Sequence, residues 1–159
     1  LFRHDHDAAI ASFERAIALD PNTAEPYAYY AECLNYAGDP EPAIELTEKA
    51  LRFDPTLPPN CAFHLGHSNF LLGNDDEARK FIGSTIERVP SFPYAHVVMA
   101  VLHAEWDRTD DAAREVAATL ELVPGFTVEN LVRIYPYRGP DMRERFQAGL
   151  LKAGFPEGG

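Results

Sequence analysis

Prolines at nearly equal intervals constrain the fold of this chain more than any other feature of its sequence. The intervals are 34, 35 and 34 residues between Pro21, Pro55, Pro90 and Pro124. An alanine stands twelve residues before each proline, at Ala9, Ala43, Ala78 and Ala112. A fixed period of this length is the signature of a repeat architecture, in which each copy is one supersecondary unit.

Each copy contains two apolar runs at helical spacing, separated by turn residues at 38–40, 73–75 and 107–109. The repeats are therefore predicted to be helical hairpins. The first helices are expected at about 24–37, 59–72 and 93–106, and the second at about 5–19, 40–53, 75–88 and 109–122. The prolines end the second helices, because a helix interior excludes proline. Small residues at Ala31, Gly66 and Ala100 allow the paired helices to approach closely.

With small residues, aromatics and terminal prolines in register, residues 1–126 resemble the tetratricopeptide repeat family. The resemblance implies an all-α fold, a right-handed superhelix of about three and a half hairpins with a capping helix pair at the C-terminus. The predicted units are 1–21, the second helix of a truncated repeat, then 22–56, 57–92 and 93–126. Thr47 departs from the pattern, since it stands where an aromatic such as Phe13 is usual, and Pro58 is an extra residue between units.

Both ends of the chain depart from the period. Residues 1–4 read as the end of a first helix, so we expect the chain to be an excised C-terminal piece of a longer protein. Residues 127–159 are predicted to form a helical cap, with a short helix at 127–134, a break at 135–140 and a last helix at 141–153. The predicted core stripe of the last helix is Met142, Phe146, Leu150 and Leu151.

Charge differs between the repeats and the cap. Residues 127–159 carry five basic and four acidic side chains, while residues 1–126 have a net charge of −12. We therefore expect ion pairs that join the cap to the acidic repeats. The candidate cations are Arg133, Arg138, Arg143 and Arg145.

The stretches 124–127, 135–140 and 149–157 are similar to the C-termini of class III adenylate or guanylate cyclases with appended repeats. The second most similar type is the C-termini of winged-helix regulators. This resemblance implies the C-terminal regulatory or scaffolding region of a larger bacterial signalling protein. The alternative is a regulatory fragment of a cyclase whose catalytic domain lies upstream of residue 1.

Composition narrows the classes of partner. The net charge of −11 repels phosphate backbones and anionic lipid surfaces, which argues against nucleic-acid and membrane partners. No apolar run reaches the roughly 20 residues that a bilayer crossing needs.

Cys33 and Cys61 are predicted to be free thiols, because about 10 Å of helix rise separates their levels on neighbouring first helices. A cytoplasmic location is expected.

The sequence contains no nucleophile motif, no phosphate-binding loop and no zinc-ligand string, despite six histidines. We therefore expect no catalytic site, no cofactor and no metal. The acids at 75–77 and 107–111 are explained by second helices that begin there, where the helix dipole favours negative charge.

In the tetratricopeptide family, the second, fifth, ninth and twelfth positions of each repeat face a concave groove. The resemblance thus implies a groove lined by Glu25, Ala28, Glu32, Asn35, Asn60, Phe63, His67, Phe70, Tyr94, Val97 and Val101, with Ala104 beside them. Such a lining suits a polypeptide segment with apolar anchors and positive charge, since Phe63, Phe70 and Tyr94 would lie beside Glu25 and Glu32. Occupation of the groove by the chain's own tail, or by a second copy in a homodimer, is an equally weighted alternative.

Overall fold

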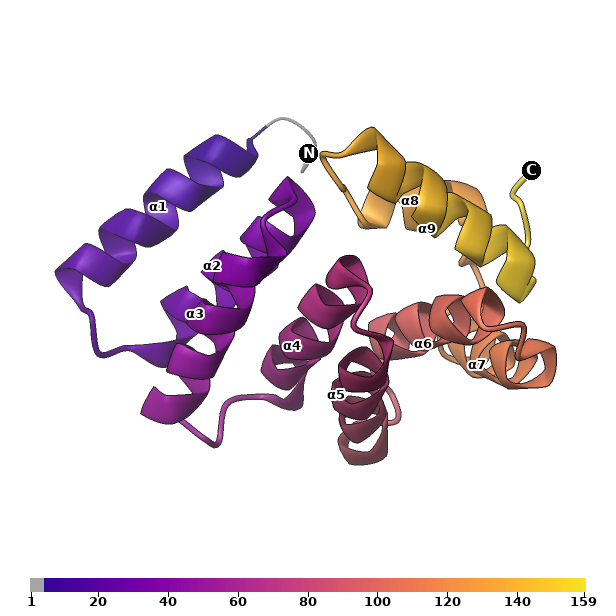
Figure 1. The fold of residues 1–159 in the computed structure, drawn as a ribbon, viewed down its shortest axis with the longest axis horizontal. Coiled ribbons are helices and arrows are strands. Elements are labelled where there is room, and N and C mark those ends of the chain that lie inside the picture. The colour runs from indigo at the N-terminus through magenta and orange to yellow at the C-terminus, as the bar shows by residue number, and fades with distance from the viewer. Residues whose placement is uncertain (1–4) are drawn as a thin grey trace. The chain divides into compact units, whose positions relative to one another are not determined.

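The computed structural model describes residues 5–159, apart from the side chains of residues 59 and 60, and over this range the chain is all-α (Figure 1). The helices are α1 (His6–Leu19), α2 (Ala24–Ala37), α3 (Pro40–Phe53), α4 (Pro59–Leu72), α5 (Asp75–Arg88), α6 (Pro93–Glu105), α7 (Thr109–Leu122), α8 (Val128–Ile134) and α9 (Pro140–Ala153). These bounds lie within one residue of the ranges predicted for all helices, so the all-α hairpin fold is confirmed. The expected first-helix remnant at residues 1–4 lies outside the described residues.

Helix ends follow the chemistry of their terminal residues. Proline occupies the first helical position of α3, α4, α6 and α9, where its missing N–H costs no hydrogen bond. Gly38, Gly73 and Gly154 end α2, α4 and α9 in the left-handed region, with φ of 98°, 75° and 102°. The repeat prolines each lie two residues beyond a second helix. After α1, the Asp20 carboxylate accepts hydrogen bonds from the Asn22 N–H and the Thr23 hydroxyl, which fixes the turn around Pro21.

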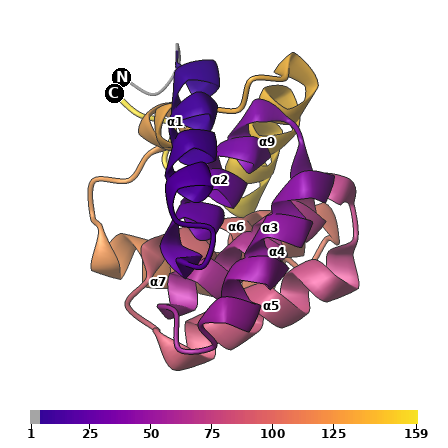
Figure 2. The ribbon, with the colours of Figure 1, turned by 90° about the vertical axis from the view of Figure 1, so that its left-hand side faces the viewer.

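The chain divides into two compact units, one up to Phe81 and the other from Ile82. In the first unit, α2 packs against α1, α3 and α4 (Figures 1 and 2). Ala31 of α2 and Ala43 of α3 are both 0% exposed and belong to one core cluster with Leu34. A second cluster joins Tyr27, Leu57 and Cys61 with neighbouring alanines. The small residues therefore mark the α2–α3 crossing, as the sequence predicts.

In the second unit, α6 packs against α7 and α9, and α9 also contacts α7 and α8. An aromatic cluster supports α9, because the Phe146 ring lies 4.6 Å from that of Tyr135 and 5.4 Å from that of Tyr137, centroid to centroid. Phe146 and Leu150 are buried as expected. Leu151 was wrongly placed in the core stripe: it is 44% exposed, because one residue of helix turns it about 100° from Leu150. Gly149 takes its place in the buried face.

Ion pairs hold α9 to the end of α6. The Arg145 guanidinium donates to both Glu105 oxygens, at 2.7 and 2.8 Å, and Lys152 Nζ lies 2.7 Å from Asp107 Oδ1. The pairing of Arg145 with a repeat carboxylate was one of the expected contacts, whereas Arg133 instead pairs with Glu129 inside α8. The segment after α9 returns to α8, where the Val128 N–H donates to the Pro156 carbonyl at 2.7 Å.

Thr47, which departs from the repeat pattern, and the two cysteines fit the packing of the first unit. Thr47 is 0% exposed, and its hydroxyl donates to the Ala43 carbonyl at 2.8 Å, so the replacement of an aromatic leaves no unsatisfied group. Cys33 and Cys61 are not joined in a disulfide, as predicted. Among the described residues, every helix is too short or too polar to cross a lipid bilayer.

His96 joins three segments of the second unit. Its Nδ1 lies 2.6 Å from Glu115 Oε2 of α7, and its Nε2 lies 2.8 Å from the Pro90 carbonyl oxygen. Both neighbouring atoms are acceptors, so the two hydrogen bonds form together only when the ring carries both protons. The hydrogen bond to Glu115 is the main reason that the pKa of His96 is raised, and burial opposes it.

A substitution at Gly149 tests the packing of α9 on α6. A Cβ atom at Gly149 would lie 2.5 Å from Val101 Cγ1. Val101 cannot rotate away from this Cβ atom, because a β-branched side chain in a helix has one strongly preferred rotamer. We expect Gly149→Ala to lower the free energy of unfolding by about 1–3 kcal/mol despite the better helix propensity of alanine. Gly125→Ala, where a Cβ would meet nothing within 4 Å, is the matched control for urea unfolding. Equal stability of the two variants would contradict this close approach.

The pH dependence of His96 tests the double hydrogen bond. A raised folded-state pKa stabilises the fold below the unfolded value of about 6.5, and this contribution is lost as the pH rises through the folded pKa. An NMR titration should place the pKa of His96 above that unfolded value. Glu115→Gln should lower the pKa, whereas Glu121→Gln, at an exposed site of α7, should leave it unchanged. A titration curve that Glu115→Gln does not move would show that the carboxylate does not hold the ring.

Candidate partner-binding surface

One face of α2 keeps accessible surface within the described residues of the first unit. Glu25 is exposed, Tyr29 is 51% exposed, and Glu32 and Tyr36 are half-buried. The spacing of 4, 3 and 4 residues places these four side chains within about 60° of one another around the helix. We call this set, Glu25, Tyr29, Glu32 and Tyr36, the α2 stripe.

The other side of α2 is fixed against α4 by buried polar groups. The Ser68 hydroxyl donates to Asn35 Oδ1 at 2.7 Å, and Asn35 Nδ2 lies 3.4 Å from the His64 carbonyl oxygen. Asn35, a predicted groove residue, is only 1% exposed, and Ala28 is equally buried. Both residues therefore pack inside the first unit.

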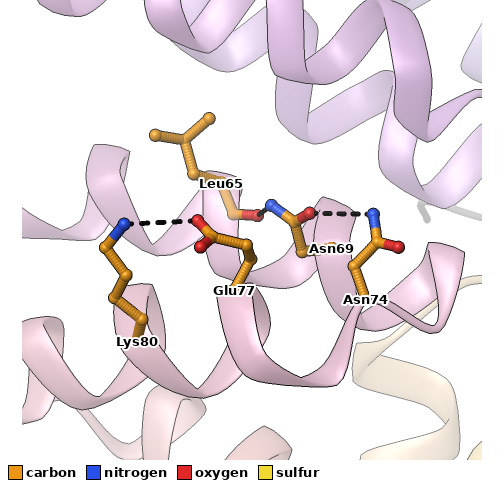
Figure 3. A network of polar contacts seen from close by, with 5 residues as sticks. All are labelled: Leu65, Asn69, Asn74, Glu77 and Lys80. Atoms are coloured by element: carbon orange, nitrogen blue, oxygen red, sulfur yellow. Dashed lines mark hydrogen bonds and ion pairs between the residues drawn. The ribbon is translucent and has the colours of Figure 1, made fainter.

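A second polar connection fixes the end of α4. Asn69 Nδ2 donates to the Leu65 carbonyl at 2.8 Å, while Asn69 Oδ1 accepts from Asn74 Nδ2 at 3.1 Å (Figure 3). In the same view, Lys80 Nζ lies 3.3 Å from Glu77 Oε2 on α5. The Asn69–Asn74 contact ties the last turn of α4 to the residue that precedes α5.

The predicted groove residues of α4 are buried. Phe63 is 4% exposed, and His67 and Phe70 are both 0% exposed. The His67 ring stacks on Phe63 and meets Tyr36 edge-on, at centroid distances of 5.6 and 5.4 Å. The side chain of Asn60 lies outside the described part of the structure. Phe63 and Phe70, expected as apolar anchors for a partner, are thus not accessible in this structure, because aromatic packing between α2 and α4 uses this face.

In the second unit, the predicted groove positions of α6 face the tail of the chain. Val97 and Val101 are 0% exposed, and Val101 makes the close approach to Gly149 of α9. Tyr94 is half-buried, and its carbonyl accepts a hydrogen bond from the Tyr135 hydroxyl at 3.1 Å. The C-terminal segment therefore contacts α6 at Val101 and Tyr94, two of the predicted lining residues. The predicted residues that keep accessible surface are Glu25, Glu32 and Tyr94.

The electrostatics of the α2 stripe are those of a site for positive charge. Residues 5–81 contain 14 acidic and 5 basic side chains, a net charge of −9, whereas residues 82–159 have 11 and 8, a net charge of −3. Burial raises the pKa of the Glu32 carboxyl. Burial, followed by the charges of Glu32 and Glu25, raises the pKa of the Cys61 thiol at the start of α4. Both carboxylates therefore act on the same region beside α4.

The described residues bring no three potential metal ligands together. His64 and His67, three residues apart on α4, are instead buried neutral rings, and burial lowers their pKa values to about 4 and about 3. The charge of His64 lowers the pKa of His67 further.

Sequence reasoning did not identify Tyr29 and Tyr36 as surface residues of the site. The signal was present, since both tyrosines follow a glutamate by four residues, at Glu25 and Glu32. The family pattern instead predicts that the second, fifth, ninth and twelfth residues of each repeat line the groove. The accessible stripe of α2 is rotated slightly from that set, because Ala28 and Asn35 turn toward α4.

Fold and surface together define a helical-repeat protein of the tetratricopeptide type. The chain belongs to the family described as anaphase-promoting complex, cyclosome, subunit 3, whose model matches residues 3–85, more than half of the chain. The sequence matches no curated protein.

Solved structures with the same fold include those of MamA and YrrB. A crystal structure of MamA has a TM-score of 0.65 at 23% identity, with 94% of this chain and 86% of that chain covered. MamA from Desulfovibrio magneticus RS-1, from residue 41 to its end, has a TM-score of 0.65 at 13% identity, with 96% and 89% covered. YrrB, described as a TPR protein with an unusual peptide-binding site, has a TM-score of 0.59 at 23% identity, with 93% and 76% covered.

Burial of two neutral histidines on α4 predicts acid sensitivity. Their folded pKa values, about 4 and about 3, lie below the ordinary histidine value of 6.5, so the unfolded chain binds protons first as the pH falls. Stability should therefore be complete above pH 6.5 and fall below it. Between pH 7 and pH 5 we expect a loss of about 2 kcal/mol for each ring.

Urea unfolding at the two pH values measures this loss. His67→Phe, which keeps a ring against Phe63 and Tyr36, should remove about half of the pH dependence. An unchanged pH dependence in this variant would contradict a neutral, buried His67.

Proposed function

We propose that the chain is a protein–protein interaction module that binds a segment of another polypeptide along the α2 stripe. The observation that carries this proposal is the exposed Tyr29, half open to solvent between two carboxylates on an otherwise packed helix. Aromatic side chains are enriched where proteins bind one another, because they contribute a large contact area at low entropic cost. The fold shared with YrrB, a TPR protein with a peptide-binding site, supports the same class of function.

The partner segment should carry positive charge and apolar anchors. Glu25 and Glu32 provide negative charge in a unit with a net charge of −9 over residues 5–81. Tyr29 and Tyr36 take the role of apolar contacts that the sequence suggested for Phe63 and Phe70. A binding role that uses these side chains needs no catalytic group or cofactor.

The α6 region is a less favourable place for a partner. A competitor would have to displace α9, whose Phe146, Leu150 and Ala153 are buried. Each large apolar side chain that returns to water costs about 1.5–3 kcal/mol, so removal of α9 costs a large share of a domain's stability. We therefore assign Val97 and Val101 to the interior that α9 closes, and we propose that the partner binds the first unit.

The larger context follows from the sequence of the tail. We propose a C-terminal regulatory or scaffolding region of a larger bacterial signalling protein, in the cytoplasm, with a cyclase parent as the alternative. These statements rest on the resemblance of residues 124–157, since the comparisons above concern repeat proteins. The repeat boundaries at 21, 56, 92 and 126, and association of two copies, likewise stay predictions.

Truncation of the exposed tyrosine tests the proposed surface. The full chain would be screened against an array of 15-residue peptides, and the affinities of the binders measured by fluorescence anisotropy. We expect Tyr29→Ala to weaken binding about 5- to 10-fold, as for a central aromatic of an interface. Leu122→Ala, at a side chain of the second unit that is 39% exposed, is the control and should leave the affinity unchanged. Loss of binding in the control alone would move the site to the second unit.

A further inference from the structure

The α2 stripe has the spacing of a helix-pairing surface. Its members recur at 25, 29, 32 and 36, which are steps of 4, 3 and 4 residues. The pairs 25 and 32, and 29 and 36, are each seven residues apart, which is the heptad spacing at which two helices stay in contact along their length. Glu25 and Glu32 are seven residues apart, so about 10.5 Å of helix rise separates them.

Glu32 lacks a cation within the described part of the chain. Some other acids of the first unit do have partners: Glu14 accepts from the Tyr30 hydroxyl, Asp76 pairs with Arg79, and Glu77 pairs with Lys80. Glu32 is half-buried, and its desolvation raises the carboxyl pKa, which means that its charge is held at a cost. A cation brought by a partner would recover that cost, since a charge pair strengthens where water is partly excluded.

We propose that the partner segment is an amphipathic helix with Lys or Arg at two positions seven residues apart, which pair with Glu25 and Glu32. This inference rests on the proposed function and names the partner's chemistry. The partner residues between the two cations lie over Tyr29, and those beyond the cation at Glu32 lie near Tyr36, where aliphatic side chains or cations can contact the rings. A helix suits the stripe because its own seven-residue repeat has the same rise of about 10.5 Å.

The chain itself contains an example of a cation over a tyrosine of α2. Lys49 Nζ of α3 lies 4.7 Å from the centroid of the Tyr27 ring, on the packed side of the helix. A further cation of the partner would make the corresponding contact at Tyr29, which is 51% exposed.

Two synthetic 18-residue helices of equal composition test the proposal on the full chain. One carries lysines at positions i and i+7, on the same face, and the other at i and i+5, about 140° apart. We expect the first peptide to bind at least about 10-fold more tightly, and its affinity to fall as salt is raised. Glu25→Gln and Glu32→Gln should each weaken it about 5-fold. Glu45→Gln, at an exposed position of α3 opposite its buried face, is the matched control.

The outcomes separate this inference from the proposed function. Equal binding of the two peptides, or full affinity in both glutamine variants, overturns the inference. If array peptides still bind in a manner that depends on Tyr29, the interaction role stands while the helical, two-cation partner is wrong. If neither helix binds while extended peptides bind in a manner that depends on Tyr29, the inference is overturned and the proposed function stands. If no peptide binding depends on Tyr29, the proposed function fails as well.

Discussion

The close approach of paired helices at alanine is the constraint on which the first unit depends. Ala31 of α2 and Ala43 of α3 are fully buried, and a larger side chain at either position would push the helices apart. This contact fixes the rotation of α2 about its axis. Once Ala31 turns toward α3, the face that carries Glu25 and Tyr29 must turn to solvent. The same two alanines that build the hairpin therefore determine which residues can meet a partner.

Buried hydrogen bonds add specificity to this packing. Asn35, Ser68 and the His64 carbonyl join α2 to α4, and such groups must find their partners because an unsatisfied polar atom inside a protein is costly. A slip of one residue between the helices would break these bonds while leaving apolar contacts nearly as good. The polar core thus holds the register of neighbouring repeats. It also removes Asn35 from the set of residues that a ligand could reach.

The sequence predicted the helices closely because their ends depend on local chemistry. Proline at the first turn, glycine in the left-handed region and a fixed period of small residues all act within a few residues of the chain. Exposure of the site residues depended instead on tertiary packing. His67 and Val101 occupy equivalent family positions, yet the first is covered by rings of α2 and α4 and the second by α9. Position within a repeat gives the face of a helix, but the neighbour of that face is decided by segments distant in sequence.

Stability alone does not account for the composition of the α2 stripe. A half-buried carboxylate without a cation beside it costs desolvation energy, and glutamine or alanine would fill the position of Glu32 at no such cost. Tyr29 stacks on Phe13 of α1 at a centroid distance of 6.5 Å, yet its side chain remains 51% exposed. The solvated face of α3 shows the alternative, since its exposed acids at 41, 45 and 48 carry no aromatic between them. Alternation of acid and tyrosine along α2 is therefore best explained by a contact that forms outside the folded chain.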